Sequence, residues 1–302
     1  MLEACLPAAL SPVLVCRPAL PMDKPGVLAM VARIWDGHDY IPFVWDDWLA
    51  EAQGQMIVAE YGGRIVGLCR ITWLTDCEWW LEGLRVHPDF SGRGFGRHLF
   101  HHCLGLWQQQ GGQLIRLITG QTNVAVQRLC ERAGFVRIGA LAFYQAAALD
   151  DAPESLQPLA EADIPAAMAL LERRAPLVYG LADYAWKWGA PSVDLLRRAA
   201  SGGRAWWWRN GEGLLTFWED EDDGKRLPLL QVAACAPHAL PDYLADYRRL
   251  AGQQGYGRAQ WMAPLDEAVT GSLLAAGFTA QAGEGVFFYE KRQTQADGER
   301  GK

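Results

Sequence analysis

Three glycines occupy alternate positions of one short loop, at Gly92, Gly94 and Gly96 in the stretch "DFSGRGFGRHLF". A strand-like stretch precedes this loop, and a stretch with helical spacing follows it. A loop that only reverses the chain needs one glycine, whereas alternating glycines let the backbone approach a ligand closely. The N–H groups and partial positive charge of the following helix would point to the same place. The sequence therefore predicts an anion site, most simply a phosphate site.

Two well-known phosphate-binding glycine motifs do not fit this loop. A dinucleotide fingerprint that began at Gly92 would need its third glycine where Arg97 stands. The Walker pattern ends in Gly-Lys-Ser/Thr, and the loop contains no lysine. A glycine-rich turn without a ligand is the alternative to a phosphate site of another kind.

The hydrophobic pattern around the loop alternates between strand and helix periodicity, which predicts an α/β protein of the α+β type. A hairpin is predicted over residues 55–74, because two β-rich runs flank Gly62-Gly63. The other predicted strands are 13–18, 78–86, 113–119 and 135–144, and the predicted helices are 23–35, 44–52, 96–110 and 123–133.

The second half of the sequence repeats features of the first half in the same order, about 140 residues later. "DIP" at residue 163 opens a predicted helix as "DKP" does at residue 23, and "AGF" occurs in both halves. The stretch "AALDDAPESLQ" near residue 150 is a candidate linker. We therefore predict two tandem domains, 1–150 and 151–302; the alternative is a chance match of a few short strings.

Composition narrows the classes of function. The net charge of −7 argues against a nucleic-acid-binding protein, which would normally be basic, and no apolar run is long enough for a membrane helix. The seven cysteines form no C-x-x-C pair, which is typical of reduced, cytoplasmic proteins. The first twenty residues lack a basic start, so no signal peptide is predicted. The expected protein is cytoplasmic, a monomer or homodimer, without a nucleic-acid or membrane partner.

The stretch "LEGLRVHPDFSGRGFG", followed by "NVAVQRLCERAGF", resembles the GNAT superfamily of N-acetyltransferases. The family pattern V-x-P-x-x-(R/Q)-x-x-G-x-G is matched by Val86, Pro88, Gly94 and Gly96, while Ser91 stands at the Arg/Gln position. The later family pattern is matched by Asn123, Leu129, Gly134 and Phe135. The resemblance covers about residues 13–146. It implies two GNAT-like domains, each with a mixed central sheet flanked by helices.

The resemblance also implies acetyl-CoA as co-substrate, without a metal. The backbone of three strand residues would face the pantetheine arm, the loop would bind the pyrophosphate, and one asparagine would contact the same molecule. These cofactor-binding residues are Leu84, Arg85, Val86, Ser91, Gly92, Arg93, Gly94, Phe95, Gly96, Arg97 and Asn123.

Glu82 is the predicted general base, which would take the proton of the acceptor amine. Strand alternation places Trp80, Glu82, Leu84 and Val86 on one face, and a carboxylate among apolar side chains is costly unless it is used or paired. The alternatives are a surface glutamate or a structural ion pair. The tyrosine that acts as general acid in many members is replaced by Cys130, a second catalytic candidate that packing explains equally simply.

The stretch "RIWDGHDYIPFVWDDWL" lies where GNAT members usually build the acceptor site. Its His38, Asp39, Tyr40 and Trp45 predict an acidic and aromatic cleft for a cationic or aromatic amine. An ordinary aromatic helix pair covering the sheet is the alternative. The phrases "DYIP" and "EGLRV" are similar to histidine N-acetyltransferases.

These residues predict an acetyl-CoA-dependent N-acetyltransferase that moves an acetyl group directly to the primary amine of a small molecule, such as an amino acid. The alternatives are a non-catalytic acyl-CoA sensor and a transferase that uses a longer acyl-CoA. The second domain is expected to bind no CoA. At the place of the glycine loop it has "APHALP", whose prolines at Pro237 and Pro241 lack N–H donors.

Overall fold

The computed structural model describes residues 12–153, 155–222, 224–281, 283 and 285–293. Residues 1–11 lie outside this range. They belong to the N-terminal stretch in which the sequence predicts no signal peptide. Contacts within the chain divide it into two compact units. The first runs to Ile115 and also includes Arg292, and the second is Arg116–Lys291. This division is one of contacts, and the linker expected near residue 150 stays a prediction.

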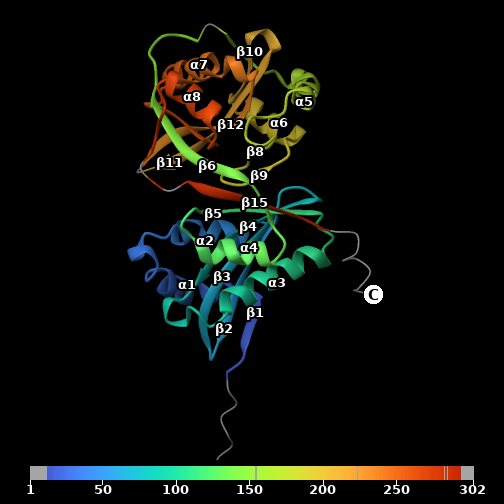
Figure 1. Ribbon diagram of the computed structural model, residues 1–302, viewed down its shortest axis with the longest axis vertical. Coiled ribbons are helices and arrows are strands. Elements are labelled where there is room, and N and C mark those ends of the chain that lie inside the picture. The colour runs from blue at the N-terminus through green and yellow to red at the C-terminus, as the bar shows by residue number, and fades with distance from the viewer. Residues whose placement is uncertain (1–11, 154, 223, 282, 284, 294–302) are drawn as a thin grey trace, which may run out of the picture. The chain divides into compact units, whose positions relative to one another are not determined.

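The first unit contains an antiparallel sheet of four strands in sequence order (Figure 1). The predicted hairpin is confirmed, and both of its turn residues, Gly62 and Gly63, have positive φ angles of 58° and 75°. The strands are β1 (Leu14–Pro18), β2 (Gly54–Tyr61), β3 (Arg64–Trp73) and β4 (Glu78–Val86).

Helices cover both faces of this sheet. Leu68 of β3 belongs to the core cluster beneath α1 and α2, whereas its neighbour Gly67 faces Leu99 of α3, so α3 packs on the opposite face. The core beneath α1 and α2 contains Val27, Met30, Trp45, Trp48, Met56 and Val58. The three helices are α1 (Lys24–Val31), α2 (Ile41–Ala50) and α3 (Phe95–Gln109).

The boundaries of two helices differ from the prediction for local reasons. α1 ends at Val31 instead of about Trp35, and Trp35 and Asp36 have positive φ angles of 47° and 54°, which no α-helix contains. α2 begins at Ile41, three residues before the predicted start, with Tyr40 as its N-cap and Pro42 in its first turn. The Asp39 carboxylate, one residue before the N-cap, accepts a hydrogen bond from the Ile41 N–H at 3.0 Å.

The second unit is built on a sheet in the order β15-β6-β13-β12-β11-β10-β7. Neighbouring strands are antiparallel except for β12 and β13, which are parallel. A separate pair consists of β8 (Ala182–Asp183) and β9 (Trp188–Gly189). The remaining strands are β5 (Leu114–Gly120, which begins in the first unit), β6 (Val136–Ala147), β7 (Leu156–Pro158), β10 (Ala205–Trp208), β11 (Gly213–Asp222), β12 (Lys225–Ala234), β13 (Arg258–Pro264), β14 (Thr279–Ala280) and β15 (Val286–Arg292).

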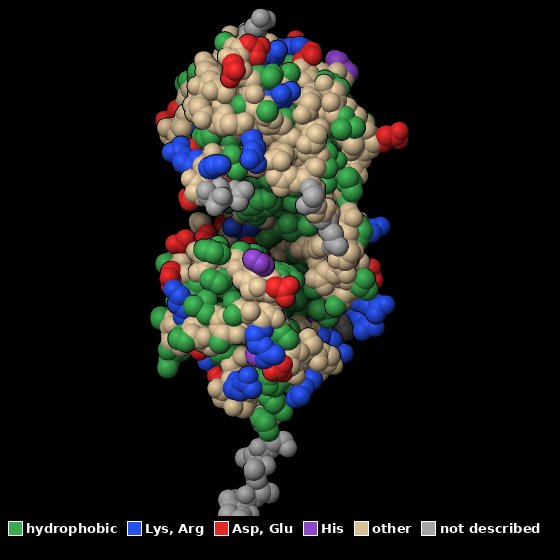
Figure 2. All heavy atoms as spheres, turned by 90° about the vertical axis from the view of Figure 1, so that its left-hand side faces the viewer, with side chains coloured by type: hydrophobic (Ala, Val, Ile, Leu, Met, Phe, Trp, Pro, Cys, Tyr) green, Lys and Arg blue, Asp and Glu red, His purple; other side chains and the backbone are tan. Residues whose placement is uncertain are grey.

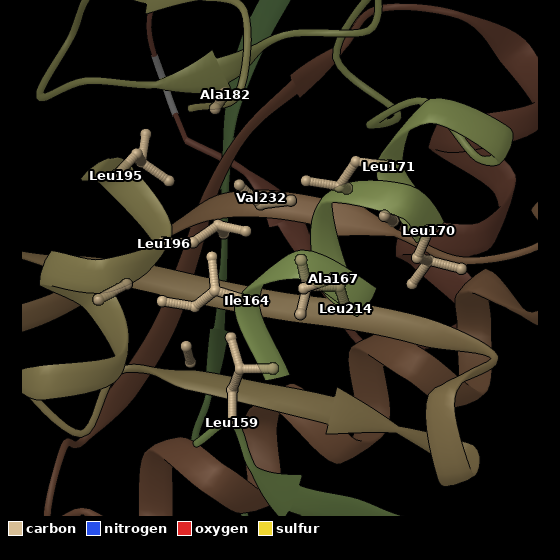
Figure 3. Packing of buried hydrophobic residues seen from close by; sticks show 13 residues of the cluster. Leu159, Ile164, Ala167, Leu170, Leu171, Ala182, Leu195, Leu196, Leu214 and Val232 are labelled. Carbon is tan, nitrogen blue, oxygen red and sulfur yellow. The ribbon is translucent and has the colours of Figure 1, made fainter. Parts of the chain in front are cut away.

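Apolar side chains of α5 and α6 fill the space above β10, β11 and β12 (Figure 3). On α7, the hydroxyls of Tyr243 and Tyr247 donate to the carbonyls of Leu214 and Pro228 at 2.8 Å, so the buried phenols are satisfied. The helices of this unit are α4 (Val124–Arg132), α5 (Ile164–Arg173), α6 (Val193–Ser201), α7 (Leu240–Gln253) and α8 (Glu267–Ala275).

The strand that follows α4 pairs with strands from the other half of the sequence. β6 pairs with β13 through residues 141–147 and with β15 through residues 136–141. β15 in turn neighbours β5, where Arg116 Nε donates to Glu290 Oε2 at 2.8 Å. The two closing strands, β6 and β15, therefore lie side by side, so residues 1–150 alone would leave β6 without its partners.

The order of elements from β1 to α4 recurs from β7 to α8, with the β8–β9 pair in the place of a short 3-10 turn. This recurrence agrees with the repeats in the sequence. Among the described residues, no helix is both long and apolar enough to cross a membrane. On the face drawn in Figure 2, basic and acidic side chains are interspersed among apolar ones, without one continuous basic surface.

Candidate active site

A β-bulge in β4 sets the geometry of the site. Arg70 of β3 lies opposite Glu82 and Leu68 lies opposite Arg85, so Gly83 and Leu84 together face one residue. The extra residue reverses the side-chain alternation beyond it, so Glu82 and Arg85 share the face covered by α1 and α2. Gly83 has a φ of 68°, and a Cβ there would lie 2.9 Å from Trp48 Cζ3, so only glycine fits.

The bulge corrects the expectation that Glu82 shares a face with Leu84 and Val86. Val86 lies on the opposite face, where a Cβ on Gly96 of α3 would approach its Cγ2 to 3.1 Å. The strand alternation used for the prediction assumes a regular strand, and one inserted residue exchanges the faces.

Glu82 is held by two side chains of β3. Its Oε1 accepts from the Thr72 hydroxyl at 2.7 Å and from Arg70 Nη1 at 3.2 Å, and 13% of its side chain is exposed. Arg70 is fully buried, also pairs with Glu51, and lies over the Trp48 ring with Cζ 4.8 Å from its centroid. Glu82 is therefore an ion-paired carboxylate, and its acceptor oxygen is oriented by two donors.

Arg85 is the second buried guanidinium of this face. Its Nε and Nη2 donate to the two oxygens of Asp39 at 2.7 and 3.4 Å, and its Nη1 donates to the Leu84 carbonyl at 3.2 Å. Its Cζ lies 4.3 Å from the centroid of Trp35 and 5.1 Å from that of Tyr40. The guanidinium thus connects β4 to the segment between α1 and α2.

The four predicted acceptor residues have different surroundings. His38 is exposed, and Tyr40 is 43% exposed, with burial around its hydroxyl raising its pKa to about 12. Asp39 is buried and paired with Arg85, so its carboxylate does not point freely into a cleft. Trp45 is fully buried in the core, where it packs. The acidic character expected at Asp39 is balanced by its ion pair with Arg85.

The glycine loop leads into α3, as predicted. Gly92 and Gly94 have positive φ angles of 76° and 81°, and Gly94 is the N-cap, so no capping side chain covers the first N–H groups of the helix. Residues 91–94 are exposed, as is Arg97. Phe95 stacks on Phe90 with ring centroids 5.9 Å apart, so the two ends of the loop are held together. The loop therefore presents backbone N–H groups and two cations, Arg93 and Arg97, to solvent.

His87 supports the segment that enters this loop. Its Nδ1 accepts from the Asp89 N–H at 3.2 Å, which requires an unprotonated nitrogen. Burial lowers the pKa of His87 below its usual value, in agreement with that role. No motif or spacing in the sequence marks this histidine as a support of the loop.

The remaining candidates lie in the second unit. Asn123 caps α4, where its side chain accepts from the Val126 N–H at 3.3 Å. Cys130 is fully buried, and burial raises its pKa to about 12. At the "APHALP" stretch, Pro237 begins a 3-10 turn and Pro241 lies in the first turn of α7.

Three polar residues around Glu82 were missed from the sequence. Arg70 and Thr72 contact Glu82 directly, and Glu51 pairs with Arg70. Arg70 and Thr72 alternate along β3, so a register for the hairpin and β4 would have placed them beside Glu82. Glu51 follows α2, and no short motif marks it. Among the described residues, no group of three or more His, Cys, Asp or Glu side chains is arranged to hold a metal ion.

Comparison with known proteins finds a family model that matches the part of the chain around this site. Residues 27–135 match the family model described as "Acetyltransferase (GNAT) family". A histidine N-acetyltransferase of Oreochromis niloticus is 34% identical over 103 residues, which are 33% of this chain and 31% of that protein. One of Xenopus tropicalis is 31% identical over 81 residues, which are 26% of this chain and 25% of that protein. The matched part is thus about a third of the length of these relatives or less.

Solved structures share the fold over nearly the whole chain. A GCN5-related N-acetyltransferase from Sphaerobacter thermophilus has a TM-score of 0.65 at 14% identity, over 92% of this chain and 95% of that one. Another, from Kribbella flavida, has a TM-score of 0.55 at 13% identity, over 93% of this chain and 71% of that one. The fold is therefore a mixed α/β fold of the GNAT type, and residues 27–135, about a third of this chain, are similar to the GNAT family of acetyltransferases.

Proposed function

We propose that this protein is an acetyl-CoA-dependent N-acetyltransferase that acetylates the primary amine of a small molecule. One observation supports this most strongly. β4 carries the oriented carboxylate of Glu82 on the face beneath α1 and α2, and the same strand leads into the glycine loop. The proposed proton acceptor on β4 and the proposed anion site in the glycine loop therefore lie close together in the sequence.

The loop residues fit the pyrophosphate of acetyl-CoA. Gly92 and Gly94 have no side chain over the backbone, the first N–H groups of α3 are uncapped by a side chain, and Arg93 and Arg97 supply positive charge. Acetyl-CoA, when bound, supplies an acetyl group activated as a thioester. We propose that residues 91–97 hold its phosphates and that the backbone of Leu84, Arg85 and Val86 meets its pantetheine arm.

The proposed reaction is a direct transfer. The amine nitrogen forms a bond to the acetyl carbon, the carbon–sulfur bond breaks, the amine gives a proton to Glu82, and the thiolate takes up a proton through solvent. Thr72 and Arg70 orient the accepting oxygen of Glu82. Cys130 is left out of this scheme, because a buried thiol with a pKa of about 12 is a poor proton donor.

We propose further that the chain is a tandem of two GNAT-like domains, 1–150 and 151–302, exchanging their closing strands β6 and β15, and that the second binds no CoA. Pro237 and Pro241 support this, because they remove N–H donors where a phosphate loop would need them. The acceptor is proposed to be a small amine such as an amino acid, in line with the activity named for the histidine N-acetyltransferases that this chain resembles over a third of its length.

The test is acetyl-CoA turnover, followed as thiol release, in the Glu82→Gln variant. Glutamine keeps the shape and the hydrogen bond from Thr72 but cannot take a proton, so the rate should fall roughly 10²-fold while acetyl-CoA still binds. Glu212→Gln, an exposed carboxylate outside the site, is the matched control and should leave the rate unchanged. A Glu82→Gln enzyme with the wild-type rate would contradict the assignment of the base. Tight acetyl-CoA binding without turnover in the wild type would favour a sensor.

A further inference from the structure

The guanidinium of Arg85 has more hydrogen-bonding capacity than its described partners use. Three of its five N–H groups donate to the two oxygens of Asp39 and to the Leu84 carbonyl. Asp39 is itself fixed, because its Oδ1 also accepts from the Ile41 N–H at the start of α2. Asp39 therefore engages the Nε side of the guanidinium, and among the remaining N–H groups of Nη1 and Nη2 Arg85 also has a hydrogen bond with the Tyr40 hydroxyl, which brings these two side chains together.

The ion pairs of Arg85 differ from those of Arg17 and Arg70 in the same unit. Arg17 bridges two carboxylates, Asp23 and Glu60, and Arg70 bridges Glu51 and Glu82. Among the described residues, Arg85 pairs with one carboxylate only. A guanidinium binds a second carboxylate through two parallel N–H···O bonds when its outer edge is open.

The surroundings of that outer edge suit a ligand. Trp35 and Tyr40 lie over the guanidinium, and both rings reach the surface, with exposures of 57% and 43%. The Tyr40 hydroxyl has a pKa of about 12, so it keeps its proton at neutral pH and can donate to an anion beside Arg85. Trp35 and Asp36 have left-handed backbone conformations, which cost energy and often mark functional segments.

We propose that Arg85 and Tyr40 bind a carboxylate of the acceptor, so that the substrates of this enzyme are α-amino acids or other amines with a carboxylate near the amine. The inference rests on the proposed function. The bulge at Gly83 places Arg85 on the same face as Glu82, so the carboxylate would be held at Arg85 while the amine approaches the base. Arg85 is then a specificity residue, and Asp39 positions it.

The experiment compares amines that differ only in the carboxylate, namely histidine with histamine and tryptophan with tryptamine, by kcat/KM for thiol release from acetyl-CoA. The kcat/KM of the wild type should be at least tenfold higher for each amino acid than for its decarboxylated analogue. The analogue would leave polar groups of the site unpaired, which lowers its kcat/KM. Equal or faster acetylation of histamine and tryptamine would overturn the inference while the proposed function stands. Turnover of no amine at all, in these pairs and in a wider panel of amino acids, polyamines, aminoglycosides and peptides, would overturn both.

Three variants separate recognition from folding. Tyr40→Phe keeps the exposed ring and should raise KM for the amino acids severalfold more than KM for the decarboxylated amines. Arg85→Lys keeps a charge for Asp39 but loses the planar fork, and it should reduce the preference for amino acids toward one. Arg197→Met removes an exposed arginine paired with Asp194 and Glu161, and it should leave the preference intact. An unchanged preference in both Tyr40→Phe and Arg85→Lys would contradict the assignment.

Discussion

Asp39 accepts a hydrogen bond from Arg85 Nε at 2.7 Å, across 46 positions of sequence. Asp39 belongs to "DYIP" and Arg85 belongs to "EGLRV", two phrases from which the sequence predicts a similarity to histidine N-acetyltransferases. The structure thus brings both phrases together on one face of the sheet. Because Tyr40 and Glu82 lie in the same phrases, this small region combines the proposed base with the proposed carboxylate site.

The glycine loop is expected to carry the affinity for acetyl-CoA. Gly94→Val forces a side chain onto a residue with a φ of 81° and covers the backbone beside α3, so affinity should fall tenfold or more, about 1.4 kcal/mol. Calorimetric titration measures this. Gly105→Ala, in the middle of α3 with open space around it, is the control and should bind normally. Unchanged affinity in a folded Gly94→Val protein would refute the loop as the phosphate site.

Thr72 is expected to position Glu82. Thr72→Val keeps the shape but removes the hydroxyl that donates to Oε1 at 2.7 Å, so kcat should fall by roughly tenfold or less, which corresponds to about 1 kcal/mol. KM for acetyl-CoA should not change, because Thr72 lies away from the glycine loop in sequence and on a different strand. Steady-state kinetics with both substrates varied would show the split. A raised KM for acetyl-CoA with normal kcat would speak against this role.

Cys130 is expected to be dispensable for chemistry. Its thiol is fully buried and has a pKa of about 12, so Cys130→Ala should retain the rate to within about threefold. The small cavity should lower the free energy of unfolding by about 1 kcal/mol. Thiol release and thermal unfolding measure the two effects. A rate loss of a hundredfold in a stable variant would restore Cys130 as the general acid.

Asp183 is expected to make stability depend on pH. It is buried, accepts from the Trp186 N–H and from Trp218 Nε1, and burial raises its pKa to about 7. Below about pH 4 the carboxyl is protonated in both folded and unfolded chains. As pH rises from 4 to 7 only the unfolded chain ionises, so the free energy of unfolding should fall by up to about 4 kcal/mol.

Thermal unfolding between pH 4 and pH 8 tests this, with Asp183→Asn as the comparison. The amide cannot ionise, so the variant should lose the part of the decline that Asp183 causes, and the two curves should converge at acidic pH. The same slope in both proteins would show that Asp183 does not titrate in this range.

The sequence predicted most of the elements because their signals are local. The glycine turn of the first hairpin and the spacing of α3 both depend on neighbouring residues, and both are confirmed. The pairing of β6 with β13 and β15 could not be predicted in this way. It depends on strands more than 100 residues away, and no periodicity within β6 indicates which partner it takes.

The site was predicted less completely for a related reason. Glu82 and the loop are marked by short motifs. Which later residues of β4 lie on the same face as Glu82 depends on a one-residue bulge at Gly83. The same bulge turns Arg85, expected to contribute only its backbone, into a side chain of the site. Trp45 was expected in the cleft because it lies in an aromatic stretch, but its position on α2 points into the core.

Amine-dependent acetyl transfer tests the central claim most directly. The full chain is mixed with acetyl-CoA and, in turn, free amino acids, polyamines, aminoglycosides and peptides, while released thiol and acetylated amine are quantified together. The account predicts equal amounts of both products with at least one amine, and their loss in Glu82→Gln. Binding of acetyl-CoA without acetylation of any amine, or turnover that is unaffected by Glu82→Gln, would contradict it.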